Sequence, residues 1–502
     1  MKRLWYQAGA RGIVPFVSDT RTTPHAPVAA ATAAVRRSAP APAAGLSTLG
    51  LITVLTGAAL PMLDFFIVNV ALPTIDHDLH AGPAVLEMVV GGYGVAYAVL
   101  LVLGGRLGDM VGRKRLFLWG TAAFGVTSVA CGLAPDAWSL VVARIAQGAA
   151  SALMLPQVLA TIQATTEGTR RTKALSLYSC TAGVAASVGQ VLGGVLVSVD
   201  VLGTGWRSIF LVNAPVAVVA LVLAVRTIPE TRSERPSGVD VRGTLLLSVA
   251  LISLLVPLTE GRATGWPVWS WVLLAVFPVS AVAFVVVERR EEAAGRTPLI
   301  PPSLLRIHSV RSGLTVIVPF SIGWGGYMFV VAVVLQEGLR LGPMAAGLAL
   351  LPLCLTFLIG SLAGPRLAAR YGRGVVTAGS LLQAAGLVGL AATFHWGWDG
   401  LGAVGPAPAL AVQGLGQGLL FPVAIRAVLS EVPVGQAGVG GGVLTTTQQA
   451  FMALGVATLG SLFLSLSGSM GMRDAVVVTL GVQLVAVALT VLSSLRLPRK
   501  LA

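Results

Sequence analysis

The chain has 502 residues, of which 55% are hydrophobic and only 11% are charged, whereas soluble domains carry about 25% charged residues. This composition excludes an ordinary soluble protein and predicts a polytopic membrane protein, in which 60 glycines suit closely packed helices. The formal net charge of +14 would suit a nucleic-acid partner only if the basic residues gathered away from the membrane faces.

The N-terminal segment, residues 1–45, is rich in Ala, Pro, Thr and Arg, and we expect it to be a disordered cytoplasmic tail. After it come apolar runs of about 20 residues, the length that crosses a bilayer. The fourteen transmembrane helices that these runs predict cover residues 47–71, 84–104, 115–133, 138–160, 173–199, 208–227, 242–259, 268–287, 311–335, 344–363, 374–395, 405–429, 437–466 and 474–495. We therefore expect an all-α membrane fold.

The basic residues sort to one side of this arrangement. With both termini cytoplasmic, 29 of the 34 Lys and Arg residues lie on the cytoplasmic side. The positive charge then faces the inner leaflet of the lipid bilayer, and we expect no nucleic-acid partner. Three cysteines, all inside apolar runs, form neither a disulfide framework nor a metal site.

Asp64 is the only acidic residue placed well inside an expected helix. A carboxylate at that depth must be solvated or paired, so we expect it to face a cavity or a partner. An acid that reaches the outer surface, or one that only holds helices together, is the alternative. The run from Leu63 to Pro73, which includes Asn69, resembles the helix 1 signature L-D-x-[TF]-[IV]-[VI]-N-[VI]-A-L-P of the fourteen-span drug:proton antiporters. The resemblance implies that Asp64 takes part in proton coupling.

A short basic connection, residues 104–115, joins the second and third expected helices. Its glycines permit a tight turn, and Asp109 lies within helical spacing of Arg106 and Arg113. The connection resembles the loop G-x-L-x-D-x-x-G-R-[KR] of the major facilitator superfamily, which implies a gate between two half-transporters. A positive-inside loop with no further role is the alternative. The expected gating residues are Gly105, Gly108, Asp109, Gly112 and Arg113.

Arg144 lies inside the fourth expected helix, where it must be paired or hydrated because its guanidinium stays charged. The pattern around it resembles the helix 4 motif of the same superfamily. The resemblance implies that Arg144 acts with Asp64 in proton transfer, and an ion pair that only connects helices is the alternative.

The fifth expected helix resembles the antiporter motif G-x-x-x-G-P-x-x-G-G. Ala185 stands where the motif has its first glycine, and Gln190 stands where it has proline. The loss of the proline places strict proton-coupled antiport in question, although the small residues still predict a close-packing surface. The motif residues are Gly189, Gln190, Gly193 and Gly194.

Internal repeats relate the two ends of the chain. Shifts of 260 and 266 residues superpose motifs of the second and fourth expected helices on motifs of the tenth and twelfth. The identical pairs are Gly104 and Gly364, Arg106 and Arg366, Leu107 and Leu367, Gly112 and Gly372, Arg113 and Arg373, Gln147 and Gln413, Gly148 and Gly414, and Pro156 and Pro422. The parts predicted are an N-terminal six-helix half (46–230), two inserted helices (231–297) and a C-terminal six-helix half (298–497).

The repeat keeps its glycines but loses two charges. Ala369 replaces Asp109, and Leu410 replaces Arg144. We therefore expect asymmetric chemistry on a symmetric frame.

Aromatic and neutral amide side chains inside the expected helices are candidates for lining a substrate cavity. Such groups suit bulky, amphipathic and often cationic compounds, although any one of them can equally be ordinary helix packing. The candidates are Asn69, Tyr93, Tyr97, Gln157, Trp324, Tyr327, Gln336, Gln417 and Gln448. We expect no metal site at residues 76–80, which should form an outer loop, and no cofactor, since a G-x-x-x-x-G-K-[ST] nucleotide loop is absent.

These motifs occur in order over residues 47–497 and together resemble those of multidrug and antibiotic exporters in bacterial plasma membranes. The resemblance implies a monomeric, proton-coupled secondary transporter, not an enzyme, that exports drugs, antibiotics or other amphipathic small molecules by alternating access. Its partners would be that substrate, protons and the lipid bilayer. An importer or uniporter on the same fold, or a transport-inactive membrane sensor or scaffold, is the alternative.

Overall fold

The structure is a computed structural model that describes residues 45–200, 203–232, 240–261, 264–296, 298–433 and 437–498. Every regular element in these ranges is a helix. The expected all-α fold is therefore confirmed. The predicted N-terminal tail lies almost entirely outside the described residues.

The N-terminal half consists of six long helical segments. Its elements are α1 (Thr48–Leu79), α2 (Gly82–Val111), α3 (Arg113–Gly132), α4 (Ala137–Thr165), α5 (Gly168–Val199), η3 (Gly205–Arg207), α6 (Ser208–Leu211) and α7 (Asn213–Thr227). The sixth segment is divided into η3, α6 and α7. Pro215 lies in the first turn of α7, where a missing backbone N–H costs no helical hydrogen bond.

The inserted pair consists of α8 (Val241–Glu260) and α9 (Val268–Ala293). The C-terminal half contains α10 (Pro302–Arg306), α11 (His308–Val333), η4 (Val334–Gly338), α12 (Pro343–Ala349), α13 (Leu351–Tyr371), α14 (Gly374–Gly397), η5 (Trp398–Gly400), α15 (Ala407–Leu429), α16 (Ala437–Gly455), η7 (Val456–Gly460), α17 (Ser461–Met470) and α18 (Met472–Ser494). Elements η4 and η7 are π-helical turns, a widened geometry that often marks functional sites.

Thirteen helical segments among the described residues are long and apolar enough to cross a membrane. The remaining expected helix, at residues 115–133, is present as α3, whose first turn carries three basic residues that lower its mean hydropathy. All fourteen expected segments are thus helical. Two boundaries were wrong. The outer loop expected at residues 76–80 is instead the last turn of α1, and His80, with φ of 49°, ends that helix. The connection expected at residues 104–115 is helical up to Val111, where α2 ends.

Helix ends follow local sequence signals. Ser47 caps α1 by accepting from the backbone N–H of Gly50 at 3.0 Å. Asp136 caps α4 in the same way, accepting from the backbone N–H of Ser139 at 2.9 Å. Asp240 caps α8, so its carboxylate lies at the start of the inserted pair. Side-chain oxygens are suited to these ends because the first backbone N–H groups of a helix lack partners within it.

Glycines bring equivalent helices together in both halves. A Cβ on Gly148 of α4 would overlap the backbone of Tyr93 in α2. A Cβ on Gly414 of α15 would likewise overlap the backbone of Leu353 in α13. The repeated glycines therefore serve the same close packing in the α2–α4 pair and in the α13–α15 pair.

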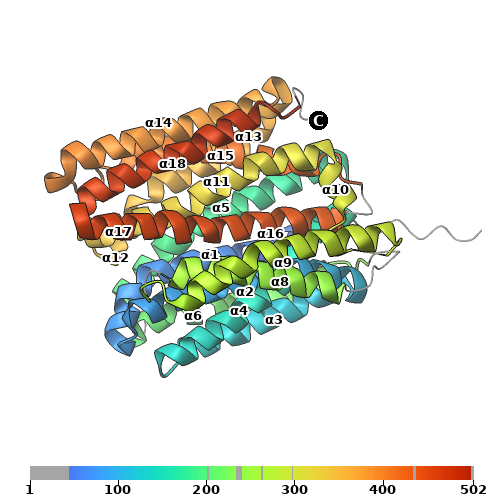
Figure 1. The fold of residues 1–502 in the computed structure, drawn as a ribbon, viewed down its shortest axis with the longest axis horizontal. Coiled ribbons are helices and arrows are strands. Elements are labelled where there is room, and N and C mark those ends of the chain that lie inside the picture. Colours follow the sequence, from blue (N-terminus) through green and yellow to red (C-terminus); the bar gives the residue numbers. More distant parts are fainter. Residues whose placement is uncertain are drawn as a thin grey trace, which may run out of the picture. The chain divides into compact units, whose positions relative to one another are not determined.

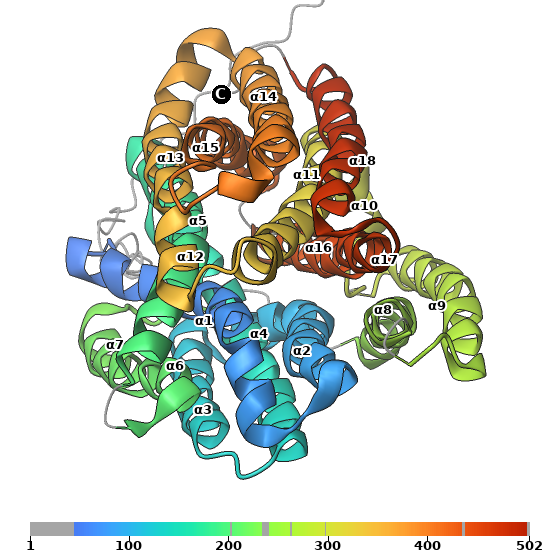
Figure 2. The same cartoon turned by 90° about the vertical axis from the view of Figure 1, so that its left-hand side faces the viewer.

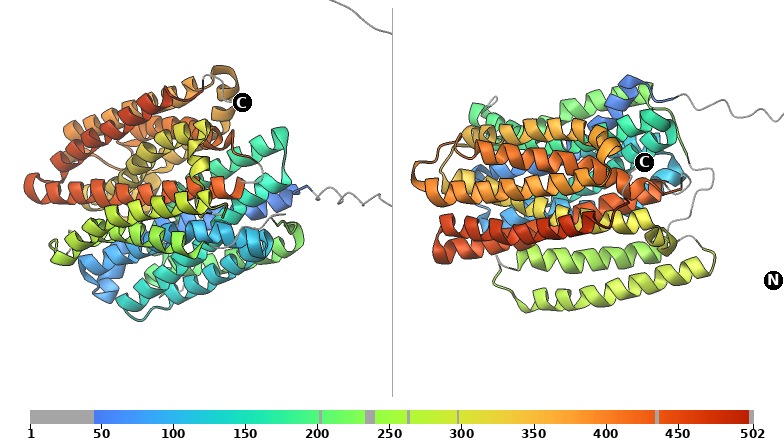
Figure 3. Two further views of the ribbon diagram at one scale, coloured as in Figure 1. Left: turned by 45° about the vertical axis from the view of Figure 1, so that its right-hand side comes forward. Right: turned by 90° about the horizontal axis from the view of Figure 1, so that it is seen from above.

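The helices between residues 45 and 498 form two groups, with the inserted pair beside them (Figure 1). Figure 2 shows the N-terminal half in blue to green, the C-terminal half in yellow to red, and α8 and α9 next to α2 and α17. The right-hand view of Figure 3 shows α8 and α9 as a separate layer. The two halves meet where α5 contacts α12 and α13 and where α2 contacts α16.

Candidate functional site

A buried ion pair joins Asp64 of α1 to Arg144 of α4. Arg144 Nη1 donates to Asp64 Oδ2, and both side chains are 0% exposed. The structure therefore brings together the two residues that the sequence assigned to proton coupling. An enclosed charge of this kind is tolerated only with a partner of opposite sign and further hydrogen bonds.

Two amide side chains complete the surroundings of Asp64. Asp64 Oδ1 accepts from Gln147 Nε2 at 3.0 Å and from Asn213 Nδ2 at 2.7 Å. Both amides also donate to Ser128 Oγ, at 3.1 and 3.0 Å. Ser128 Oγ donates in turn to Phe210 O at 2.9 Å. The cluster thus connects α1, α3, α4, α6 and α7 within the N-terminal half.

Arg144 is held on several sides. Its Nη1 donates to Gln147 Oε1 at 2.8 Å, and its Nε donates to Val89 O at 3.1 Å. The guanidinium carbon lies 4.2 Å from the centre of the Tyr93 ring, a cation–π arrangement. Tyr93 itself is fixed by hydrogen bonds to Pro61 O at 3.1 Å and with Ser151 Oγ at 2.9 Å.

Sequence reasoning missed part of this cluster. Asn213 and Ser128 were not assigned to the site, and Gln147 was noted only as part of a motif. Each is a polar residue within an apolar run, which is a weak signal because membrane helices contain many such residues. Only the packing of α3 and α7 against α1 shows that these side chains face Asp64.

The two members of the pair differ in whether they can change charge. Asp64 is the member that can take up a proton, because a guanidinium stays charged in proteins. Protonation would leave Arg144 without its compensating charge, and breaking a buried pair costs about 3–5 kcal/mol. A proton on Asp64 would therefore weaken the contact that joins α1 to α4.

The connection between α2 and α3 consists of Gly112 alone, whose φ of 114° suits glycine. Arg113 Nη2 donates to Asp109 Oδ1 at 2.8 Å, and Arg113 Nη1 reaches Ala160 O of α4 at 3.4 Å. The Arg113 and Asp109 side chains are mostly buried. The predicted gate residues thus form one contact between the end of α2, the start of α3 and α4.

The preceding turn of α2 packs on α4. A Cβ placed on Gly105 would lie 3.6 Å from Pro156 Cβ. Gly108 lies directly against the side chain of Gln157. Gln157 Nε2 donates to Gly104 O at 2.8 Å. Gln157, a cavity candidate, therefore connects the two helices at this end.

Arg106 points from α2 to segment 298–300, which precedes α10. Its Nη2 donates to two backbone carbonyl oxygens of the segment, those of Pro298 and, at 2.9 Å, Leu299. The carboxylates of Asp240 and Glu288 accept from two backbone N–H groups of the same segment, at 3.2 and 2.7 Å. The segment is thus held by α2, by the start of α8 and by α9.

The antiporter-like motif of α5 packs on α1. Cβ atoms on Gly189 and Gly193 would come within 2.6 and 2.8 Å of carbonyl oxygens of α1, and Gly194 is also buried. Gln190 Nε2 lies 3.9 Å from the sulfur of Met328 in α11. At the position where the motif has proline, the side chain therefore contacts the opposite half.

A cavity of about 510 Å³ lies between α1, α2, α8, α11, η4, α16, η7 and α17. Its polar lining residues are Asn69, Asp76, Glu87, Thr259, Gln336, Glu337 and Ser461. Asn69 and Gln336 are two of the predicted cavity residues. The three carboxyl groups were not predicted there, because acids near helix ends usually face solvent. Both π-helical turns form part of the wall.

The other cavity candidates are enclosed in this conformation. None of Tyr93, Tyr97, Gln157, Trp324, Tyr327, Gln417 and Gln448 is more than 4% exposed. They can line a passage only if neighbouring helices separate. In the part of the chain that the structure describes, no cluster of His, Cys, Asp and Glu could hold a metal ion.

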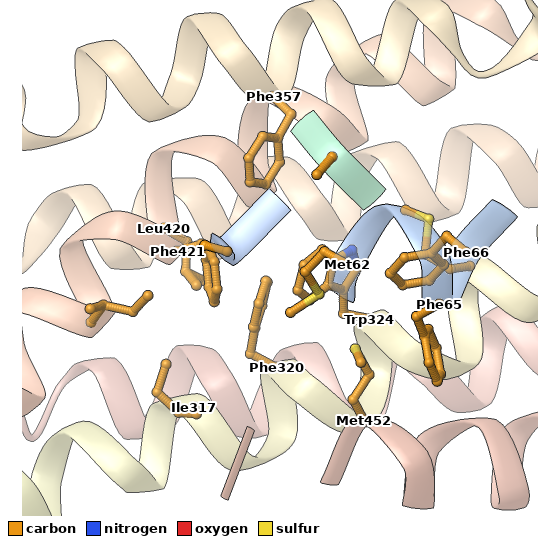
Figure 4. Close-up of a cluster of buried hydrophobic side chains, with 14 of the residues drawn as sticks. Met62, Phe65, Phe66, Ile317, Phe320, Trp324, Phe357, Leu420, Phe421 and Met452 are labelled. Atoms are coloured by element: carbon orange, nitrogen blue, oxygen red, sulfur yellow. The ribbon is translucent and has the colours of Figure 1, made fainter. Parts of the chain in front are cut away.

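An aromatic cluster fills the space between the halves (Figure 4). The ring of Trp324 lies 5.4 Å from Phe421 of α15 and 6.3 Å from Phe66 of α1. Phe320 stacks on Phe421 at 5.4 Å. Phe65, which lines the cavity, meets Phe66 edge to face at 5.1 Å. The aromatic rings therefore run from the cavity wall into the C-terminal half.

Residues 54–456 match the family described as Major Facilitator Superfamily. The probable actinorhodin transporter of Streptomyces coelicolor is 37% identical over 84% of this chain and 73% of its own length. The tetracenomycin C resistance and export protein of Streptomyces glaucescens is 32% identical, covering 83% and 76%. The cephamycin export protein of Amycolatopsis lactamdurans is 34% identical, covering 82% and 84%.

A similar fold occurs in the solved structure of the human organic anion transporter MFSD10. The TM-score is 0.58, and the similarity covers 88% of this chain and 99% of that one. At 15% identity, this likeness concerns the fold alone.

Proposed function

The chain belongs to the major facilitator superfamily, and from that premise we propose that it is a proton-coupled exporter of amphipathic small molecules. It is a multi-pass membrane protein. The names of three relatives refer to the transport, resistance or export of antibiotics, which supports efflux as the direction and antibiotics as the cargo class.

The observation that carries proton coupling is the enclosed pair of Asp64 and Arg144. Among the ion pairs of the described residues, it is the one in which both side chains are 0% exposed. A transporter driven by protons needs a group that changes its charge between the two faces of the membrane. Asp64 has the depth, the partner and the chemistry for this role.

In the proposed cycle, a proton from the outside binds Asp64 and weakens its interactions with Arg144, Gln147 and Asn213. The changed packing of α1 favours release of the cargo. Loss of the proton to the cytoplasm then restores the pair and resets the site, as alternating access requires. Asp109 and Arg113 would hold the gate closed in the outward-facing state.

Replacing Asp64 by Asn tests this cycle, because Asn keeps the shape and one acceptor oxygen but cannot titrate. In everted vesicles with an imposed pH gradient, we expect export by the variant to fall to the background of vesicles without the protein. Binding of a neutral cargo should persist. Arg144→Lys should impair the same step less completely, since a charge remains but the planar fork is lost. Undiminished export by Asp64→Asn would move the proton site elsewhere, with Glu87 or Asp109 tested next.

The proposed orientation places both termini and the gate in the cytoplasm, following the distribution of basic residues. In a variant without native cysteines, a cysteine at Lys114 or Arg290 should react with a membrane-impermeant thiol reagent only in everted vesicles. Labelling of either position in intact cells would contradict the orientation. Growth of an efflux-deficient host on a panel of dyes and antibiotics would identify the cargo.

A further inference from the structure

Two glutamines of α15 have amide groups with no partner. Gln413 and Gln417 are both 0% exposed, and the Nε2 and Oε1 atoms of each make no hydrogen bond within the described residues. Buried polar side chains are paired in the large majority of cases, and leaving them unpaired opposes folding. Two glutamines with unpaired amides, one turn apart in the same helix, therefore call for a physical reason.

Several other buried amides of the same protein are paired. Gln147, the repeat equivalent of Gln413, hydrogen-bonds Arg144, Asp64 and Ser128 in the N-terminal half. Gln483 of α18 donates to Gly323 O at 2.9 Å. Within the described residues, no other glutamine leaves both of its amide atoms buried and unpaired.

Gln417 lies one helical turn before Phe421 of the aromatic cluster, and Gln413 lies one turn further away, against Gly386 of α14. Residues four apart lie on one face of a helix, so Gln413, Gln417 and Phe421 form a row along α15. Phe421 lies 5.4 Å from Trp324, which also contacts Phe66 of the other half. The row therefore combines aromatic faces, which suit a flat ring system, with donors and acceptors for its polar groups.

We propose that Gln413 and Gln417 bind the hydroxyl and carbonyl groups of a neutral, polycyclic aromatic cargo whose rings lie against Trp324 and Phe421. This proposal rests on the proposed function as a transporter. The cargo is neutral because the side chains of this cluster carry no charge, while Asp64 and Arg144 neutralise each other elsewhere. A charged group would lose its hydration there without gaining a counter-charge.

Access to this site requires movement between the halves. Helix α15 contacts α5 of the N-terminal half, and Trp324 contacts Phe66 of the same half. Separation of these contacts uncovers the row, which is what alternating access does to a site between two halves. In the closed arrangement, Phe65 and Phe66 connect the row to the cavity.

The test compares two neutral three-ring probes, the dihydroxyanthraquinone danthron and anthracene, which lacks polar groups. Binding to the purified full-length protein is measured for the wild type, for the double variant Gln413→Leu with Gln417→Leu, and for Gln483→Leu. We expect the double variant to bind danthron at least about tenfold more weakly, the effect of one lost hydrogen bond, and anthracene as before.

Thermal unfolding separates a binding role from a structural one. The double variant removes unpaired amides, so its melting temperature should be unchanged or raised. Gln483→Leu removes a paired amide at equal burial, so the melting temperature of this variant should fall. The ratio of its affinities for danthron and anthracene should stay the same as in the wild type. Unchanged danthron affinity in the double variant, a melting temperature lowered as in Gln483→Leu, or no danthron binding by the wild type would overturn the proposal.

These outcomes are distinct from failure of the proposed function. If Asp64→Asn loses gradient-driven export while the double variant binds danthron normally, the amide site is wrong and proton coupling stands. If Asp64→Asn exports normally while the double variant loses danthron binding, proton coupling through Asp64 is wrong and the amide site stands.

Discussion

The two six-helix halves share a scaffold but differ in the side chains that it holds. Gly148 and Gly414 bring equivalent helices into the same close contact. The basic residues that follow Gly112 and Gly372 behave differently: Arg113 pairs with Asp109, whereas Arg373 donates to backbone carbonyls just after α18, including Leu497 O at 3.1 Å.

The difference continues into the membrane core. The shift of 260 residues places Trp324 at the position equivalent to Asp64, and the shift of 266 residues places Leu410 at the position equivalent to Arg144. The N-terminal core is therefore a paired, charged network, whereas the C-terminal core is aromatic and contains the unpaired Gln413 and Gln417. Backbone packing needs the glycines in both copies, whereas the buried charged pair occurs in the N-terminal copy.

The largest effect is expected from Arg144→Leu, which gives the N-terminal half the residue of its repeat. Asp64 would remain enclosed without a charged partner, and the free energy of unfolding should fall by about 3–5 kcal/mol. Denaturant unfolding in detergent measures the loss. Adding Asp64→Leu should restore most of the stability but not gradient-driven export. Leu410→Met should change stability by less than about 1.5 kcal/mol, and a stable Arg144→Leu would refute the enclosed pair.

A smaller effect is expected at Gly112 and Gly372, where the two halves are alike. Gly112 and Gly372 have φ of 114° and 55°, so a Val at either position should cost about 1–3 kcal/mol of stability. Only Gly112 adjoins an ion pair, that of Asp109 and Arg113. Gly112→Val should therefore abolish transport while the protein still reaches the membrane, and Gly372→Val should retain part of it. Normal transport by Gly112→Val would leave this connection without a gating role.

The smallest change in the free energy of unfolding is expected at Arg106, and it should exceed the change at Arg366, its repeat equivalent. Arg106 is buried and donates to the carbonyls of segment 298–300, so Arg106→Gln should lower the free energy of unfolding by about 1 kcal/mol. Arg366, its repeat equivalent, is exposed and makes one long bond, to Leu362 O at 3.4 Å. Arg366→Gln should stay within about 0.5 kcal/mol of the wild type. Equal effects at both positions would mean that Arg106 does not hold the segment.

Most of the helical fold was predictable because the bilayer imposes it locally. A helix that crosses the membrane needs about 20 apolar residues, and each of the fourteen runs of this kind is helical. The exceptions, at residues 76–80 and 104–111, have one cause. Polar residues do not end a helix at the membrane face, and α1 continues until His80 adopts a left-handed conformation.

The sequence determined which residues carry charge inside the membrane, because Asp64 and Arg144 interrupt apolar runs and are visible one at a time. Only the tertiary structure decided that Asn213 and Ser128 complete their cluster, that Arg106 holds segment 298–300, and that Gln417 has no partner. The physical reason is that a membrane helix is apolar on nearly every side. Its sequence therefore lacks the periodicity that would show which face meets which neighbour.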